Sequence, residues 1–161
     1  LGHHRLFTKG PFFYSELVRM PLVMRYPGRI EAGRTIDRVV SFVDLAPTLL
    51  EIAGQPIPEP MQGRSLVGLL ADPASAQHID ECFLEYDEQQ GHKYPARGIV
   101  TSRYKYIDYL HDTQDMLFDL EKDPRQRRNV FSDPGYSPVV QRLRSRLADW
   151  RRETNDPLLN R

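Results

Sequence analysis

Apolar and polar positions fall into two patterns along the chain, which meet near residue 75. In the first, an apolar run at residues 21–26 is closed by Pro27 and Gly28. A short apolar run bounded by turn residues predicts a buried strand that ends in a turn. A polar and apolar mixture at residues 35–43 then leads into a segment with helical periodicity.

That segment predicts a helix from Asp44 to about residue 53. Asp44 is a suitable N-cap, Pro47 lies in the first turn where its missing N–H is tolerated, and Gly54 is placed to end the helix in a left-handed conformation. The expected apolar face comprises Leu49, Leu50 and Ile52. After a proline-rich connector, residues 65–70 predict a second short helix that ends near Asp72.

The second pattern is mainly an alternation with period two. It predicts four strands, at residues 81–86, 96–101, 104–110 and 115–120. In residues 104–109 aromatic side chains alternate with polar ones, which is typical of an antiparallel strand with one face in solvent.

A long amphipathic helix is predicted to follow these strands, with Ser137 as its cap and Pro138 in its first turn. The expected buried face comprises Val139, Val140, Leu143, Leu147 and Trp150. The expected polar face carries Arg142, Arg144, Arg146, Arg151 and Arg152. A small antiparallel sheet packed by a C-terminal helix is an α+β arrangement, and we expect it to span residues 76–161.

Composition narrows the possible partners. The 161 residues carry a formal net charge of zero, so the sequence gives no reason to expect nucleic-acid binding. No apolar run approaches the roughly 20 residues that span a membrane. The single cysteine, Cys82, excludes an internal disulfide and leaves the cellular compartment open.

The first ten residues carry the most distinctive chemistry. Lys9 is a compact cation with three donors beside the turn formed by Gly10 and Pro11, and it suits a tetrahedral oxyanion such as sulfate or phosphate. His4 precedes it by five positions and is suited to donate to the same anion or to move a proton. From these residues alone, an ordinary solvated loop remains the alternative.

Several short blocks, in a fixed order, resemble the sulfatase family of the alkaline-phosphatase superfamily. They are Leu1-Gly2-x-His4-x-Leu6-x-x-Lys9-Gly10, residues 13–30 from Phe13-Tyr14-x-Glu16 to Gly28-Arg29-Ile30, residues 43–50, residues 61–66, Arg103-Tyr104-Lys105-Tyr106-Ile107, and residues 117–124. Each block is weak alone, and their order and spacing together carry the resemblance.

This resemblance implies an alkaline-phosphatase-like α/β parent fold. Residues 1–75 would be the C-terminal end of the large α/β domain, and residues 76–161 the small C-terminal subdomain. The parent would hydrolyse a small-molecule or glycan sulfate ester with a formylglycine nucleophile and a divalent metal (Ca, or Mg or Mn). The formylglycine motif and the metal ligands of the family are missing here, and Cys82 lacks the required Pro and Arg. We therefore expect this C-terminal fragment to bind no metal itself and to be inactive alone.

The resemblance also suggests roles for individual residues. Lys9 would bind a sulfate oxygen, and His4 would donate a hydrogen bond near the leaving group. Glu16 and Arg19 would support this loop. Arg5 stands where the family commonly has Gly, which matters if the position needs a positive φ. In the second part, the resemblance suggests that His92 or Lys93 in one loop, or Arg97 after it, helps to form the substrate pocket, and a hairpin loop without a ligand remains the alternative.

Two alternatives stay open. Within the superfamily, the parent could be a phosphodiesterase, a phosphonate hydrolase or a phosphoethanolamine transferase. Outside it, the chain could be a non-catalytic binding or oligomerisation domain. The apolar faces of residues 22–24 and 45–53 are expected to be exposed, so a homodimer of the fragment is a further possibility.

Overall fold

The computed structural model describes residues 2–7, 10, 12–74, 77–87, 94–110 and 114–159. Contacts divide the chain into two compact units. The sheet unit comprises Leu1–Met20 and Phe83–Arg161, and the helical unit comprises Pro21–Cys82. This division differs from the expected boundary at residues 75 and 76, because the N-terminal segment packs with the C-terminal sheet. Assignment of residues 1–75 to a larger parent domain remains a prediction.

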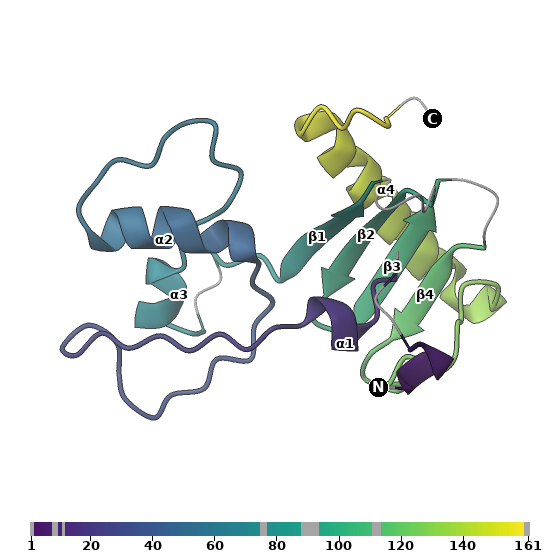
Figure 1. The fold of residues 1–161 in the computed structure, drawn as a ribbon, viewed down its shortest axis with the longest axis horizontal. Coiled ribbons are helices and arrows are strands. Elements are labelled where there is room, and N and C mark those ends of the chain that lie inside the picture. The colour runs from purple at the N-terminus through teal and green to yellow at the C-terminus, as the bar shows by residue number, and fades with distance from the viewer. Residues whose placement is uncertain are drawn as a thin grey trace. The chain divides into compact units, whose positions relative to one another are not determined.

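The four strands that the alternating pattern predicts are present, and they form one sheet in the order β1-β2-β3-β4 (Figure 1). They are β1 (Glu81–Tyr86), β2 (Ala96–Thr101), β3 (Tyr104–Tyr109) and β4 (Met116–Asp119). β2 and β3 are antiparallel, and so are β3 and β4, with Lys105 opposite both Val100 and Phe118. The antiparallel sheet with a C-terminal helix is therefore confirmed.

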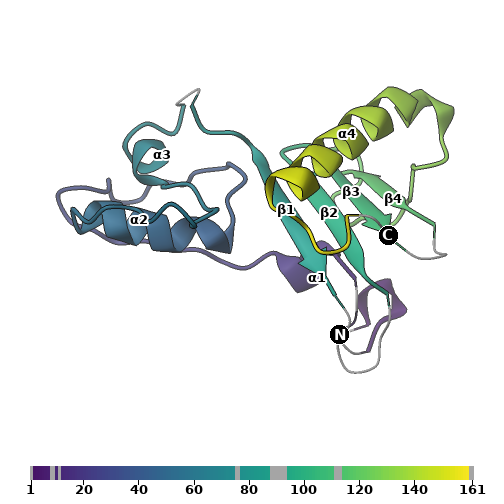
Figure 2. The same ribbon diagram turned by 90° about the horizontal axis from the view of Figure 1, so that it is seen from above.

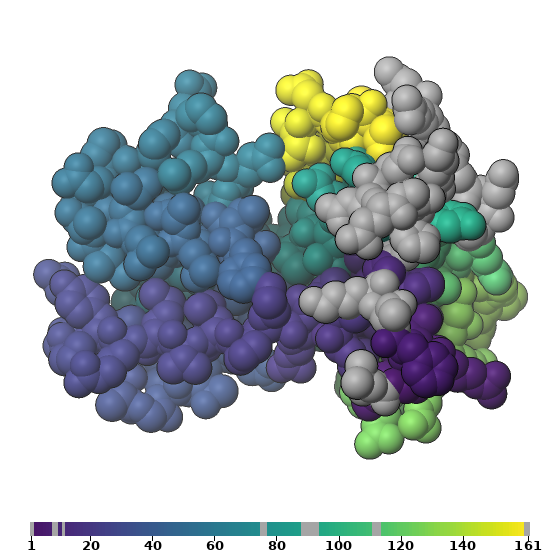
Figure 3. Space-filling view, in the orientation of Figure 1, coloured from purple at the N-terminus to yellow at the C-terminus, as the bar shows by residue number. Residues whose placement is uncertain are grey.

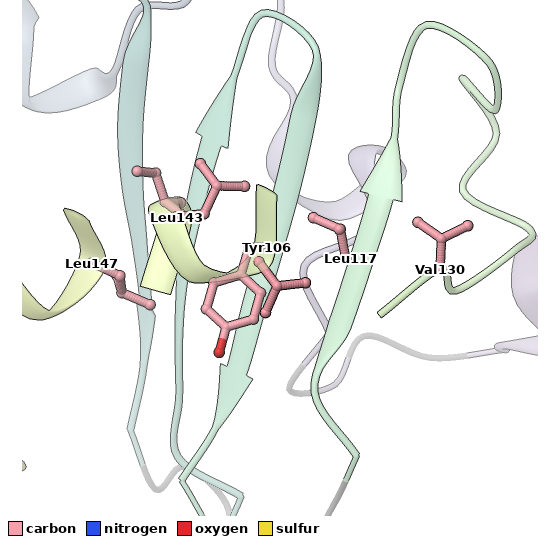
Figure 4. Close-up of a cluster of buried hydrophobic side chains, with 7 residues drawn as sticks. Tyr106, Leu117, Val130, Leu143 and Leu147 are labelled. Carbon is pink, nitrogen blue, oxygen red and sulfur yellow. The ribbon is translucent and has the colours of Figure 1, made fainter. Parts of the chain in front are cut away.

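Helix α4 (Ser137–Glu153) covers one face of this sheet (Figure 2). Leu143 and Leu147 point from it toward Tyr106 of β3 and Leu117 of β4, as Figure 4 shows. Trp150 stacks on Phe83 of β1, with ring centroids 4.7 Å apart. The predicted buried face of α4 is thus largely correct.

Two details of this helix were predicted wrongly. The helical run begins earlier than Ser137, in the 3-10 turn η3 (Pro134–Tyr136), and Asp133 caps that turn by accepting from the Gly135 amide at 3.0 Å. Arg151 was expected on the solvated face but is only 8% exposed. A buried carboxylate, Asp156, compensates its charge.

The opposite face of the sheet is covered by the N-terminal segment, which includes α1 (Ser15–Val18). Phe13 packs with Ala96, Ile107 and Phe118 there. In the space-filling view the purple N-terminal residues lie against the green residues of the same unit (Figure 3). The expectation that β3 keeps one face in solvent is therefore wrong, because a segment some 90 residues earlier covers that face.

In the helical unit, α2 (Leu45–Ile52) and α3 (Val67–Ala71) form as predicted. Gly54 has φ 66° and completes the C-terminal cap of α2, with the Gln55 amide bonded to the Leu50 carbonyl at 2.9 Å. Asp44 does occupy the N-cap position of α2, as predicted, but its side chain makes no capping bond to that helix. It instead accepts from the Ser41 amide at the start of the preceding 3-10 turn η2 (Phe42–Asp44), which Ser41 caps.

The predicted strand at residues 21–26 is absent from the structure. Val23 is 90% exposed and Leu22 is 43% exposed. An extended segment becomes a strand only when another strand satisfies its backbone groups, and among the described residues no strand pairs with this segment. The exposure expected for residues 22–24 and for the α2 face is confirmed at Leu22, Val23 and Leu49.

Candidate functional site

A left-handed turn presents the two N-terminal histidines. In the short helical turn η1 (His3–Arg5), His4 has φ 51° and Arg5 has φ 60°, after Gly2 at φ 90°. Arg5 therefore does adopt a positive φ where the family pattern commonly has Gly. Backbone hydrogen bonds between Gly2 and Leu6 hold the turn, and non-glycine residues in this region cost about 1–3 kcal/mol each. Such conformations occur preferentially where a side chain must be aimed.

The His4 ring is held between an aromatic ring and a carboxylate. It stacks on Tyr14 with ring centroids 3.7 Å apart and planes at 8°. Its Nε2 lies 3.6 Å from Oε2 of Glu16, and its side chain is only 13% exposed. The other oxygen of Glu16 lies 3.0 Å from Nδ1 of His3, whose side chain is 68% exposed. One carboxylate thus contacts both imidazoles.

Electrostatics keep Glu16 in its charged form. Burial alone would raise the pKa of Glu16, but hydrogen bonds from its own backbone amide and from His3, with the charges of His4 and His3, hold that pKa below its ordinary value. The pKa of Tyr14 is raised, first by burial and then by the negative charge of Glu16. At neutral pH the His4 ring therefore lies between an anionic carboxylate and a neutral phenol, and a histidine held in this way is suited to donate a hydrogen bond or transfer a proton.

Of the predicted site residues, only His4 and Arg97 fall within the described part of the chain. Lys9, His92 and Lys93 lie outside it. The structure confirms that Glu16 approaches the N-terminal loop, as its supporting role requires. The predicted catalytic role of His4 and the predicted pocket around Lys9 stay predictions.

Arg97 is placed differently from what a substrate ligand would need. Its side chain is fully buried on β2, where Nε and Nη2 bind the two oxygens of Asp156 at 2.9 and 2.8 Å. Nη1 donates to the carbonyls of Tyr86 and Ala96 and pairs with Asp87. These bonds tie the end of β1 and the start of β2 to the C-terminal tail. The geometry favours a structural role for Arg97 over direct contact with a substrate.

Sequence reasoning gave no role to two residues that shape this group. Tyr14 supplies the stacking surface for His4, and Lys105 on β3 donates to the carbonyl of Phe13 at 2.7 Å. The only sequence signal for Lys105 is a charged residue inside an aromatic strand. Its contact with a segment 92 positions earlier is visible only in the fold.

Among the described residues, no group of three His, Cys, Asp or Glu side chains is placed to hold a metal ion. Cys82, the only cysteine, lies half-buried on β1. None of the described helices is long and apolar enough to cross a membrane.

The antiparallel sheet and its C-terminal helix have the fold found in part of sulfatases, whose parent fold is alkaline-phosphatase-like. Residues 2–153 match the family described as N-sulphoglucosamine sulphohydrolase, C-terminal. The chain belongs to this family.

Individual relatives agree with this assignment. The chain is 34% identical to an N-acetylglucosamine-6-O-sulfatase of Bacteroides thetaiotaomicron over 98% of its own length and 29% of that protein. A structure solved in complex with its substrate, D-glucosamine-2-N,6-O-disulfate, superposes with TM-score 0.84 at 31% identity, over 99% of this chain and 34% of the other. The phosphonate monoester hydrolase of Silicibacter pomeroyi superposes with TM-score 0.69 at 26% identity, over 84% of this chain and 29% of the other. The chain thus spans about a third of the length of these relatives.

Proposed function

We propose that this chain is the C-terminal part of a hydrolase of sulfate esters. The observation that carries the proposal is the match of nearly the whole chain, residues 2–153, to a family of sulfatase C-terminal regions. The oriented His4 at the start of the chain supports it, because sulfate ester cleavage needs a donor near the leaving oxygen.

Sulfated sugars are the proposed substrate class. The relative from Bacteroides thetaiotaomicron is named for a 6-O-sulfated N-acetylglucosamine, and the superposed complex holds a disulfated glucosamine. We propose that Lys9 binds a sulfate oxygen, that His4 donates near the leaving oxygen, and that Glu16 with Tyr14 orients His4. His92 and Lys93 are proposed to contact the sugar.

Two parts of the proposed chemistry come from outside this chain. We propose that the formylglycine nucleophile and the ligands of a divalent cation (Ca²⁺, Mg²⁺ or Mn²⁺) belong to the remaining two thirds of the parent. The cation would offset charge on the sulfate oxygens, and the formylglycine would supply the attacking oxygen. We accordingly expect the isolated 161-residue chain to show no metal-dependent turnover of an aryl sulfate.

The main test is the Lys9→Ala variant of the full-length enzyme, assayed on 6-O-sulfated N-acetylglucosamine. We expect turnover to fall by about 100-fold or more, since a charged donor to the developing oxyanion is lost. Lys122→Ala is the matched control, because Lys122 is an exposed lysine that donates to the Tyr136 hydroxyl. Near wild-type turnover in Lys9→Ala would refute the role of Lys9.

A phosphonate monoester hydrolase is the second candidate, and the superposition on the enzyme from Silicibacter pomeroyi favours it. The ratio of kcat/KM for a sulfate monoester to that for a phosphonate monoester, measured on the full-length enzyme, separates the two. We expect the ratio to favour sulfate, and a ratio well below one would replace the first proposal with the second.

The exposed apolar residues give a further proposal for the isolated chain. Leu22, Val23 and Leu49 are 43%, 90% and 59% exposed. We propose that the isolated chain forms homodimers through these side chains. Sedimentation at several concentrations tests this, and a monomer at every concentration would contradict it.

A further inference from the structure

Lys105 occupies a buried position of the sheet that an apolar side chain would ordinarily fill. It lies in the middle of β3, opposite Phe118 of β4, and is 1% exposed. It faces the side of the sheet that the N-terminal segment covers, as does Ile107 two positions later. A buried ammonium is costly unless hydrogen-bond acceptors surround it, so its presence here requires a specific set of partners.

Those partners belong largely to the segment that carries the candidate site. Nζ of Lys105 donates to the carbonyl of Phe13 at 2.7 Å, to Oγ of Ser15 at 3.2 Å and to Oε1 of Gln126 at 3.1 Å. The side-chain amide of Gln126 also donates to Oγ of Ser15. An ammonium has three donors, and each of these three acceptors is within hydrogen-bond distance of it. The strand therefore grips the segment on both sides of Tyr14.

Tyr14 and Glu16 pass this constraint on to the histidine. The Tyr14 ring stacks on His4 and also contacts Phe118 at 6.0 Å between centroids. Phe118 is the residue opposite Lys105 on the neighbouring strand. The paired residues Lys105 and Phe118 thus contact the backbone of the N-terminal segment and the Tyr14 ring, respectively. Glu16, which follows Ser15, contacts both imidazoles.

We propose that Lys105 is a positioning residue for the reaction. Lys105 sets the orientation of the His4 imidazole through the segment at residues 13–16, in which Tyr14 and Glu16 contact that ring. The proposal rests on the function proposed above, in which His4 acts on the sulfate ester. It gives a role to the Arg103-Tyr104-Lys105-Tyr106-Ile107 block, which the catalytic assignment otherwise leaves unexplained.

The test compares Lys105→Met with Leu117→Ala in the full-length enzyme. Leu117 is fully buried on the α4 side of the sheet, away from the N-terminal segment, so its truncation destabilises the same unit without touching the grip on Phe13 and Ser15. We expect Lys105→Met to lower kcat by about 10- to 100-fold with a much smaller change in KM, since misplacement of a reacting group by about 1 Å costs on that scale. Leu117→Ala should lower the melting temperature and leave kcat nearly unchanged.

A double-mutant comparison separates positioning from general destabilisation. If Lys105 acts through His4, Lys105→Met should cost much less kcat in a His4→Ala background than in the wild type. Equal losses in the two backgrounds would overturn the proposal, as would a wild-type kcat in Lys105→Met.

Hydrogen exchange of the full-length protein supplies a readout that does not depend on activity. In Lys105→Met and in the milder Ser15→Ala variant, residues 12–18 should exchange faster relative to the strands of the same unit, whereas Leu117→Ala should accelerate the whole unit together without that selective effect. Ser15→Ala removes one acceptor of Lys105 and decides the matter if Lys105→Met does not fold; unchanged exchange and kcat in it would then contradict the proposal. If the wild-type enzyme turned over no sulfate ester, the proposed function would be refuted instead. Faster exchange of residues 12–18 in Lys105→Met would still show that Lys105 holds this segment against the sheet.

Discussion

The sheet unit and the helical unit differ in the interactions that stabilise each of them internally. The sheet unit has an apolar cluster on each face of its sheet, one under α4 and one under the N-terminal segment. In the helical unit the buried described residues are few, and two of the five are polar. They are Asp44, Pro47, Thr48, Leu66 and Leu69.

In the helical unit, short buried polar side chains hold the segments in place through hydrogen bonds, a role that apolar layers have in the sheet unit. The Asp44 carboxylate accepts from the amides of Ser41 and Arg64, and Thr48 accepts from the Leu66 amide at 2.8 Å. Gly63 permits this approach, because a Cβ there would lie 1.9 Å from the Val43 carbonyl oxygen. The difference shows that the helical unit is locally specified by hydrogen bonds, while its apolar side chains remain largely exposed.

The largest effect is expected at the buried ion cluster of the sheet unit. Asp156→Ala would leave the guanidinium groups of Arg97 and Arg151 without their shared carboxylate, at a cost of about 3–5 kcal/mol in the free energy of unfolding. Native-state hydrogen exchange of the sheet unit measures it. Asp149→Ala removes an exposed carboxylate of α4 and should change stability by less than about 0.5 kcal/mol. Similar losses in both variants would refute this view of the cluster.

A matched pair of leucine truncations probes the contrast between the units directly. Leu143 is 2% exposed in the sheet unit, and Leu49 is 59% exposed in the helical unit. We expect Leu143→Ala to cost about 2–5 kcal/mol and Leu49→Ala less than about 0.5 kcal/mol in the isolated chain. Hydrogen exchange resolved by unit gives both values. A large cost at Leu49 in the isolated chain would mean that the helical unit has an apolar core after all.

Acid should affect the sheet unit through Asp156. Burial would raise the pKa of this carboxyl, but hydrogen bonds from Arg97, the Leu158 amide and Arg151 lower it to about 2. Because the folded pKa lies below the unfolded value of about 3.9, the stabilisation is present above about pH 4 and is lost as the pH falls toward 2; it amounts to about 2 kcal/mol. Denaturation of the wild type and of Asp156→Asn between pH 5 and pH 2 tests this, since the variant should lack this component of the pH dependence. Identical pH dependence would contradict it.

The smallest of these effects is expected at the polar anchor of the helical unit. Asp44→Ala leaves the amides of Ser41 and Arg64 without their acceptor and should cost about 1–2 kcal/mol. Exchange at residues 41–52 and 64–71 should accelerate, while the sheet unit stays protected. Faster exchange in both units would show that they do not behave independently.

Much of the sheet unit could be predicted from sequence because its strands and α4 carry clear periodicities. The covered second face of β3 could not, since the alternation of Tyr104, Lys105 and Tyr106 does not reveal that Lys105 finds acceptors 92 positions earlier. At residues 21–26 the error was of the opposite kind, because burial in a sheet was predicted and most of these residues are exposed. Their apolar character suits a strand, but pairing depends on a neighbour that the local sequence cannot specify.

The candidate site divides in the same way. The approach of Glu16 to His4 was foreseeable because both lie in one short segment with a recognisable pattern. Arg97 was expected to face a substrate because it follows a polar loop, yet its buried partner Asp156 lies 59 positions later. Long-range ion pairs of this kind are set by the fold and leave no local signal.

The bond between Lys105 and the Phe13 carbonyl also fixes an order of events during synthesis. A chain grows from its N-terminus, so residues 13–16 leave the ribosome 92 positions before the lysine that holds them. At roughly 5–20 residues per second, that separation corresponds to a delay of roughly 5–20 seconds. The histidine turn thus emerges before β3, and we expect it to become ordered only after β3 has formed, because contacts so distant in sequence are intrinsically slow to form.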